Sequence, residues 1–318
     1  MREVLIVSPA APDSLTGNAT TARRWAGILG RIGHDVSVAK SYDGEPCDAL
    51  IALHARRSAP SITRFHEHCP TRPLLVALTG TDLYSDIERD EEARRSLELA
   101  TRLIVLQGEA PAALPEHLRA RTRVIYQSVE PPEHVPERSE SSFDVCVIGH
   151  LRPVKDPLRT AQAARLLPST SRVRVVHLGG ALDEGMAGAA RAEETRNPRY
   201  VWRGAVSHDE TLRTLASSHL HAITSRMEGG ANAVCEALAL GVPTVSTHIP
   251  GSVGLLGQDY PGYFPFGETE ALAQLIDRAE TDPTFYQSLT TKCENRATLV
   301  RPEQEQAAWV QLMDEFED

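Results

Sequence analysis

The sequence lacks the features of membrane proteins, disulfide-rich proteins and general nucleic-acid binders. Its 318 residues contain no apolar run near the length of about 18 that spans a bilayer. Five scattered cysteines, never spaced C-x-x-C, argue against a disulfide framework or a zinc site and favour a reducing compartment. The formal net charge of −10 disfavours a general nucleic-acid binder, because phosphate backbones require a basic surface.

Three further signals are missing. The apolar run after Met1 is too short for a signal peptide, so we expect a soluble, cytoplasmic protein without a membrane partner. No G-x-G-x-x-G follows an apolar run, which disfavours a Rossmann oxidoreductase. No convincing cluster of carboxylates or histidines could hold a divalent ion, and we therefore expect neither a metal nor another cofactor.

Short apolar runs alternate with helical patterns along the whole chain. Their hydrophobicity is nearly continuous, which is typical of strands buried on both faces of a parallel sheet. We expect strands at residues 3–8, 34–40, 48–54, 73–79, 102–107 and 122–128, then at 143–149, 172–179, 200–206, 220–225 and 242–247. This pattern predicts an α/β protein.

A proline- and glutamate-rich linker at residues 129–142 separates the two groups of strands. We predict two doubly wound domains, at residues 1–135 and 142–301, that face each other across a cleft. Ligands of such sheets bind at the carboxyl ends of the strands. A helix at 302–318 has one strongly apolar face, and we expect it to pack back onto the first domain.

The stretch 225–247 carries the main candidate site. Glu228 lies in the loop after the strand that ends at Ser225, and Glu236 lies in a helix for which Asn232 is the expected N-cap. The N-terminus of that helix favours an anion such as a diphosphate. The two carboxylates would accept hydrogen bonds from hydroxyl groups on either side of the diphosphate. A nucleotide sugar has such hydroxyls, on its sugar and on its ribose. The alternative for the pair taken alone is an ordinary loop followed by a surface helix, because glutamates at this spacing are common by chance.

A second candidate element follows the strand at 143–149. Arg152 and Lys155 come directly after it and could hold a diphosphate while stabilising the charge of a departing nucleotide. The alternative is a solvated basic turn.

The first half carries polar residues at its own strand ends. They form an expected acceptor site for a small anion rather than a neutral sugar. Alternatively, the arginines are solvated and the histidine is a core residue. The candidate acceptor residues are Gly17, Asn18, His54, Arg56, Arg57, Thr79, Gly80, Thr81 and Asp82.

The strand, the two glutamates with intervening glycines, the Gly-x-Pro and the preceding Arg/Lys pair resemble the donor half of GT-B glycosyltransferases of the Glu-x7-Glu class. The resemblance implies that Glu228 holds donor-sugar hydroxyls, that Glu236 holds the ribose, and that Gly204 flanks the base. It also implies that no metal is needed, in agreement with the lack of an Asp-x-Asp pair. The diphosphate and sugar would meet the backbone of Gly229, Gly230, Ala231 and Asn232. The residues predicted to act in catalysis are Glu228, Arg152, Lys155 and His54.

The segments GNATTARRWAGILGRIGH, ALHARRSAPSITRF and ALTGTDLYSDI resemble one narrower family, the selenosugar synthases of selenoneine biosynthesis. The resemblance implies that selenophosphate is joined to the sugar of a UDP-sugar, such as UDP-N-acetylglucosamine, with release of UDP and phosphate. Two alternatives stay open. One is a conventional UDP-sugar-dependent glycosyltransferase acting on a small hydroxyl acceptor, and the other is a non-catalytic nucleotide-sugar-binding protein.

Overall fold

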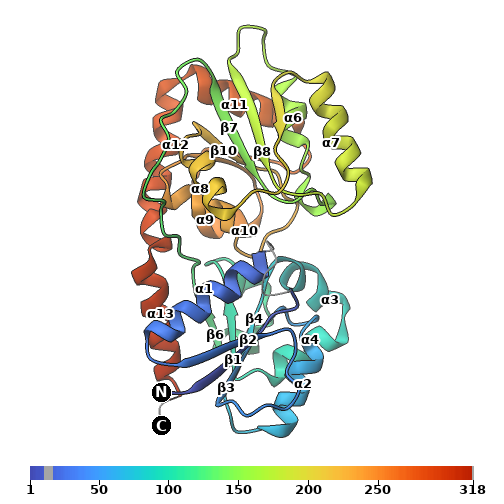
Figure 1. The fold of residues 1–318 in the computed structure, drawn as a ribbon, viewed down its shortest axis with the longest axis vertical. Helices are drawn as coiled ribbons and strands as arrows, with labels where there is room; N and C mark the ends of the chain where they lie inside the picture. Colours follow the sequence, from blue (N-terminus) through green and yellow to red (C-terminus); the bar gives the residue numbers. More distant parts are fainter. Residues whose placement is uncertain (11–16, 317–318) are drawn as a thin grey trace. The chain divides into compact units, whose positions relative to one another are not determined.

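The computed structural model describes residues 1–10 and 17–316, which form two compact units (Figure 1). Unit 1 contains Met1–Gln127 together with the segment from Pro302 onward, and unit 2 is Ser128–Arg301. No helix in the described part of the chain is long and apolar enough to cross a membrane.

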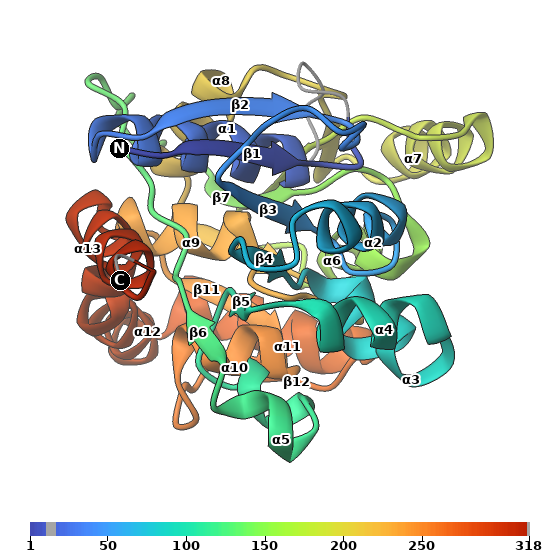
Figure 2. The ribbon, with the colours of Figure 1, turned by 90° about the horizontal axis from the view of Figure 1, so that it is seen from below.

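Unit 1 is built on a parallel sheet of six strands in the order β2-β1-β3-β4-β5-β6. All six strands predicted for the first half are present, each somewhat shorter than its apolar run. Figure 2 shows this sheet from below. The strands are β1 (Glu3–Val7), β2 (Asp35–Ala39), β3 (Ala49–Leu53), β4 (Leu74–Ala77), β5 (Arg102–Val105) and β6 (Thr122–Val124).

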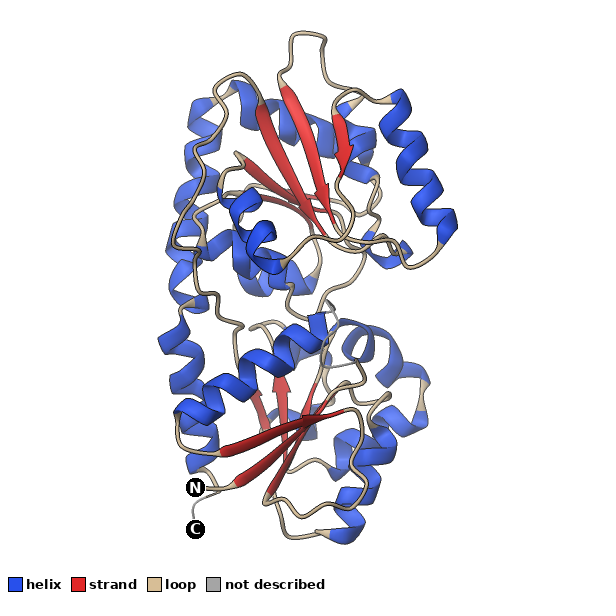
Figure 3. Cartoon of the chain, in the orientation of Figure 1, coloured by secondary structure: helices blue, strands red, loops and turns tan. Residues whose placement is uncertain are grey.

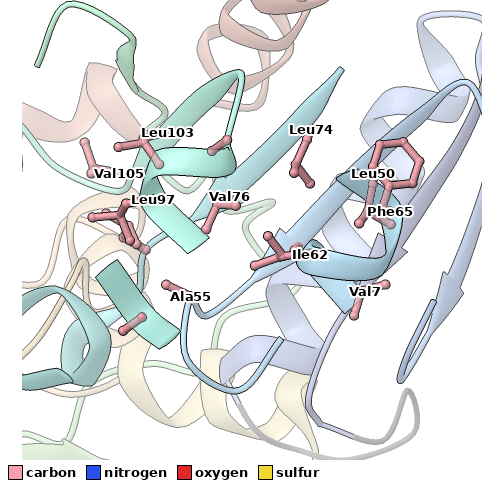
Figure 4. Packing of buried hydrophobic residues seen from close by; sticks show 14 of the residues in the cluster. Val7, Leu50, Ala55, Ile62, Phe65, Leu74, Val76, Leu97, Leu103 and Val105 are labelled. Carbon is pink, nitrogen blue, oxygen red and sulfur yellow. The ribbon is translucent and has the colours of Figure 1, made fainter. Parts of the chain in front are cut away.

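Helices cover both faces of the unit 1 sheet, and alternate strand residues point to opposite faces. Leu50 and Leu74 pack with helices α2 (Ala59–His68) and α4 (Glu91–Leu99), as Figure 4 shows. Their neighbours in the strands pack with α1 (Gly17–Arg31) and α13 (Pro302–Asp314). Shorter segments are the π-helical turn η1 (Asp82–Asp86), α3 (Ile87–Arg89), the 3-10 turn η2 (Ala110–Ala113) and α5 (Glu116–Arg119).

Helix α13 is held in unit 1 by aromatic and polar contacts with α1. The rings of Trp25 and Trp309 meet edge to face, with 4.9 Å between their centroids. Trp25 Nε1 donates to Glu305 Oε1 at 2.8 Å, and Arg24 Nε lies 2.9 Å from Glu305 Oε2. Glu305 is only 1% exposed, so this carboxylate depends on its partners in α1.

The chain passes from unit 1 to unit 2 between Gln127 and Ser128. Gln127 Oε1 accepts hydrogen bonds from Thr21 Oγ1 at 2.7 Å and Arg24 Nη2 at 2.8 Å, which ties Gln127 to α1. Two residues later, Val129 N donates to Val300 O at 3.1 Å within unit 2. These hydrogen bonds hold Gln127 in unit 1 and Val129 in unit 2.

Unit 2 contains a second parallel sheet of six strands, in the order β12-β11-β10-β7-β8-β9 (Figure 3). Five of them were expected. The sixth, β12, is two residues long between Pro261 and Pro265, and prolines interrupt a strand pattern. The strands are β7 (Phe143–Ile148), β8 (Val173–Leu178), β9 (Tyr200–Trp202), β10 (Leu220–Ile223), β11 (Thr244–Thr247) and β12 (Tyr263–Phe264).

Helices flank the unit 2 sheet and connect its strands. They are the 3-10 turn η3 (Pro153–Lys155), α6 (Arg159–Ala164), α7 (Glu184–Arg196), α8 (His208–Ala216), α9 (Asn232–Ala239), α10 (Pro250–Leu256), α11 (Thr269–Thr281), α12 (Pro283–Arg296) and the 3-10 turn η4 (Ala297–Val300). Because every strand pair is parallel, all carboxyl ends lie at one edge of the sheet, where the loops after β7, β8 and β10 meet.

Candidate active site

Two loops of unit 2 are joined where β7 and β10 end. The side chain of Thr224, directly after β10, donates to the carbonyl oxygens of Lys155 and Asp156, both at 2.9 Å. The backbone N–H of Arg226 donates to Val154 O at 2.9 Å. The turn η3 after β7 is therefore fixed against the loop that carries Glu228.

These bonds bring Lys155 and Glu228 together. Lys155 Nζ forms an ion pair with Glu228 Oε1, and the same oxygen accepts a hydrogen bond from Ser225 Oγ at 2.6 Å. Glu228 is 8% exposed, so its charge is largely removed from water and is balanced by the lysine. The sequence predicted both charged residues but not Ser225, although a serine three residues before a glutamate is a visible local pattern.

Gly251, near the start of α10, explains how Glu228 is positioned and was not singled out from the sequence. A Cβ atom at residue 251 would lie 2.0 Å from Glu228 O and 3.0 Å from Glu228 Cβ. Real side chains do not tolerate such distances, so only glycine allows the backbone of the Glu228 loop to rest on α10. The requirement is tertiary, which explains why no local motif reveals it.

Glu236 lies inside α9 and is 5% exposed. Its Oε1 atom lies 3.0 Å from Nε2 of His208, in the first turn of α8. The expected N-cap of α9 is wrong by one residue. Ala231 occupies the cap in an extended conformation without a side-chain cap bond, and Asn232 is already helical. Gly229 and Ala231 are buried, whereas Gly230 and Asn232 are half-buried.

Arg152 differs from Lys155 in its surroundings. It is half-buried and extended before η3, and its carbonyl oxygen accepts from Lys155 N at 2.9 Å. Within residues 1–10 and 17–316, no carboxylate forms an ion pair with its guanidinium group. The Arg152 side chain can therefore meet an anion without first breaking a salt bridge.

Glycines allow close backbone contact at the carboxyl ends of β7, β8 and β9. A Cβ atom on Gly179, whose φ is +150°, would lie 2.0 Å from Gly149 O. Gly179 N donates to Gly204 O at 2.8 Å, and Gly204 has a φ of +68°. Trp202 Nε1 donates to Gly179 O at 2.7 Å. Gly204, predicted to lie near the base of a nucleotide, thus belongs to a compact group of glycine-containing loops.

Two histidines in the unit 2 sheet are fully buried. His177 lies between Tyr200 Oη at 3.0 Å and Gly149 O at 2.9 Å, and burial lowers its pKa to about 4. His221 Nδ1 lies 3.2 Å from Thr244 Oγ1, and its Nε2 atom has no hydrogen-bond partner in the described residues. Burial lowers the pKa of His221 to about 3. Both rings are therefore neutral in the folded protein near neutral pH.

These low pKa values predict acid destabilisation. Below about pH 6.5 the unfolded chain protonates His221 while the folded chain does not, so stability is lost as the pH falls from about 6.5 towards 3. At pH 5 this costs about 2 kcal/mol. Urea unfolding measures this difference. Between pH 8 and pH 5, the free energy of unfolding of His221→Gln should fall by about 2 kcal/mol less than that of the wild type. Equal losses in both proteins would contradict the prediction.

Several candidate acceptor residues of unit 1 lie around the buried carboxylate of Asp82. Asp82 is 0% exposed and accepts hydrogen bonds from Ala55 N at 2.9 Å and from Thr79 N at 2.7 Å. His54, directly after β3, lies 3.2 Å from Thr81 Oγ1 through Nε2 and has a φ of 74°. Asp82 thus ties the ends of β3 and β4 together.

Burial lowers the pKa of His54, although the neighbouring carboxylates of Asp82 and Asp86 oppose the shift. A neutral imidazole in a left-handed backbone conformation, next to the π-helical turn η1, is an unusual local structure of the kind found at functional sites.

The two arginines that follow His54 have different partners. Arg56 Nε lies 2.9 Å from Asp86 Oδ2. Arg57 is exposed, and no carboxylate in the described ranges pairs with it. Gly17 and Asn18 open α1, as predicted, but no hydrogen bond among the described residues links them to the His54 group. Gly80 lies at the start of the helical segment after β4.

Comparison with solved structures identifies the fold. Alr3699/HepE of Anabaena, solved with UDP and glucose, is 17% identical, with a TM-score of 0.76 over 99% of this chain and 100% of the other. Sucrose-phosphate synthase of Thermosynechococcus elongatus is 15% identical, with a TM-score of 0.79 over 99% of both chains. With the two parallel six-stranded sheets, these similarities confirm the predicted α/β GT-B fold.

The family follows from a direct match to the sequence. Residues 129–298 match the profile of the family described as "Glycosyl transferases group 1". A glycosyltransferase of Rickettsia africae is a further structural neighbour, with 14% identity and a TM-score of 0.75 over 98% of both chains. Because the family match covers more than half of the 318 residues, this protein belongs to the group 1 glycosyl transferases.

Proposed function

We propose that the protein transfers a sugar from a UDP-sugar to selenophosphate. The observation that carries the donor half is the ion pair of Lys155 with the buried Glu228. Arg152, three residues before this lysine, forms no ion pair with the described residues. The structural neighbour Alr3699/HepE has been solved with UDP and with UDP-glucose, which supports a UDP-sugar donor. The acceptor is suggested by the resemblance of the first half to selenosugar synthases.

In this proposal unit 2 binds the donor. Arg152 and Lys155 meet the diphosphate and stabilise its charge as UDP departs. The N-terminus of α9 adds backbone N–H groups of the right polarity. Glu236 accepts hydrogen bonds from the ribose hydroxyls, and Glu228 accepts hydrogen bonds from hydroxyls of the donor sugar. Glu228 and Glu236 are 8% and 5% exposed, so little water is displaced from either carboxylate when a hydroxyl of the UDP-sugar binds to it.

The proposed chemistry has two steps. A selenium lone pair of selenophosphate attacks the anomeric carbon, a C–Se bond forms, and the C–O bond to UDP breaks with its electron pair leaving on UDP. Water then cleaves the Se–P bond and yields a selenosugar and phosphate. The protein contributes mainly by positioning the reactants and stabilising charge.

The different partners of Arg56 and Arg57 predict unequal roles in acceptor binding. Arg57 can meet an anion at once, whereas Arg56 must leave Asp86 or share it. We expect Arg57→Ala to raise the KM for selenophosphate about tenfold or more, without a comparable effect on the KM for the UDP-sugar. Arg56→Ala should have a smaller effect, and Arg57→Lys should rescue only partly. Near-wild-type kinetics of Arg57→Ala would show that this arginine is merely solvated.

The test of the function is UDP release in the presence of selenophosphate, inorganic phosphate or a neutral polyol, followed by mass spectrometry of the products. A selenium-containing sugar formed with selenophosphate supports the proposal. Glycosylation of the polyol alone would reject the acceptor and retain the donor site. Binding of UDP-sugar without release of UDP under any condition would indicate a binding protein. The proposed reaction uses no metal, so turnover should be the same in EDTA.

A further inference from the structure

We propose that His208 is a positioning residue that holds Glu236 in the orientation needed to bind the ribose of the donor. This inference rests on the proposed donor site and adds a residue from a different helix, α8, which no sequence motif of the donor half includes. The expected effect of His208 is therefore confined to the contact between Glu236 and the two ribose hydroxyls and is not a general effect on the fold.

The hydrogen bond between the two side chains carries the inference. His208 Nε2 lies 3.0 Å from Glu236 Oε1. An ionised carboxylate can only accept hydrogen bonds, so Nε2 must carry the proton and donate it. The His208 side chain is 54% exposed, whereas that of Glu236 is 7% exposed. The bond therefore spans the boundary between solvent and the buried carboxylate.

The bond also gives the two carboxylate oxygens of Glu236 different roles. Oε1 is engaged by His208, and no hydrogen bond from another described residue reaches the Glu236 carboxylate. Oε2 is left to accept from a ligand. With its orientation fixed in advance, the carboxylate loses less freedom when the ribose hydroxyls bind, and lower entropic loss means higher affinity.

The backbone of His208 is fixed by its own helix. Ser207 is the N-cap of α8, and its Oγ accepts from Glu210 N at 3.1 Å. The hydroxyl of Thr211 donates to Ser207 O at 2.9 Å. Leu215 of α8 and Ala237 of α9 share one buried apolar cluster, which packs the two helices against each other. The imidazole thus projects from a rigid first turn next to the helix that carries Glu236.

The experiment measures binding by calorimetry with two ligands, UDP and 2′,3′-dideoxyuridine 5′-diphosphate, which lacks both ribose hydroxyls. His208→Ala should weaken UDP binding about tenfold, the effect of one well-placed hydrogen bond, and leave binding of the dideoxy ligand unchanged. His208→Gln, whose amide nitrogen can donate from a similar position, should retain most of the affinity for UDP. Arg213→Ala, on the surface of the same helix, is the matched control.

Three outcomes would overturn the inference. If His208→Ala leaves UDP affinity unchanged while Glu236→Ala weakens it, the donor site stands and the positioning role of His208 fails. If His208→Ala weakens both ligands equally, His208 shapes the site generally and does not act through the ribose. If Glu236→Ala itself has no effect on UDP binding, the donor-site assignment fails along with it. In the supporting case, His208→Ala adds no further loss in a Glu236→Ala background.

Discussion

Replacing Lys155 with alanine should lower kcat/KM for the UDP-sugar by about 100-fold or more. Two effects combine. The variant loses a charge-assisted contact to the diphosphate, which is typically worth about 1.5–3 kcal/mol. It also leaves the Glu228 carboxylate, which is 8% exposed, without the cation that balances its charge. Steady-state kinetics with the donor varied, together with calorimetry of UDP, measure both effects.

Controls separate the charge from the geometry. Lys155→Arg keeps the positive charge and should retain more activity than the alanine variant. Ser225→Ala removes the second hydrogen bond to Glu228 Oε1 but no cation, so its effect should be several-fold only. Lys292→Ala, at an exposed position of α12, should be neutral. Unchanged kinetics of Lys155→Ala would reject Lys155 as a donor-site residue.

Gly251→Ala should abolish most of the activity although it replaces no charged residue. The added methyl would lie 2.0 Å from the backbone oxygen of Glu228, so either α10 or the Glu228 loop must move. Overpacking of this kind costs about 1–3 kcal/mol in stability, and a displaced Glu228 loses its contact with the sugar. We expect kcat/KM to fall about 100-fold, with a smaller decrease in thermal stability.

Gly188→Ala provides the matched control for this substitution. Gly188 also lies in a helix of unit 2, α7, but beyond its chain neighbours and the nearby backbone of α7 no described atom lies within 4 Å of the position of its added Cβ. That variant should keep full activity and gain about 0.5–1 kcal/mol, because glycine is unfavourable within helices. If Gly251→Ala behaves in the same way, the Glu228 loop is more tolerant than its close contact implies.

The sequence predicted the fold well because parallel strands buried on both faces are visible as apolar runs. Eleven of the twelve strands follow such runs, and the exception, β12, is two residues long between prolines. Gln127, the last residue of the first segment of unit 1, is held to α1 by hydrogen bonds that composition does not reveal. Local pattern thus specifies the elements, whereas their limits depend on tertiary contacts.

The candidate site was predictable where the residues follow strands directly. Lys155 and Glu228 both come after strands, and the parallel pairing of β7 with β10 makes them neighbours. His208 and Gly251 were missed because their roles arise only when α8 and α10 pack near Glu236 and Glu228. Asp82 was predicted in the acceptor site, yet its carboxylate accepts from backbone amides in a fully buried position.

The discontinuity of unit 1 has a consequence for biosynthesis. Its first segment ends at Gln127, and its last helix begins at Pro302, so all 174 residues of unit 2 are synthesised between them. At about 5–20 residues per second, roughly 9–35 seconds pass before α13 can emerge. During that interval α1 exposes Trp25 and lacks the carboxylate of Glu305. The six strands of the N-terminal sheet are therefore complete long before the helix that packs against Trp25 has emerged.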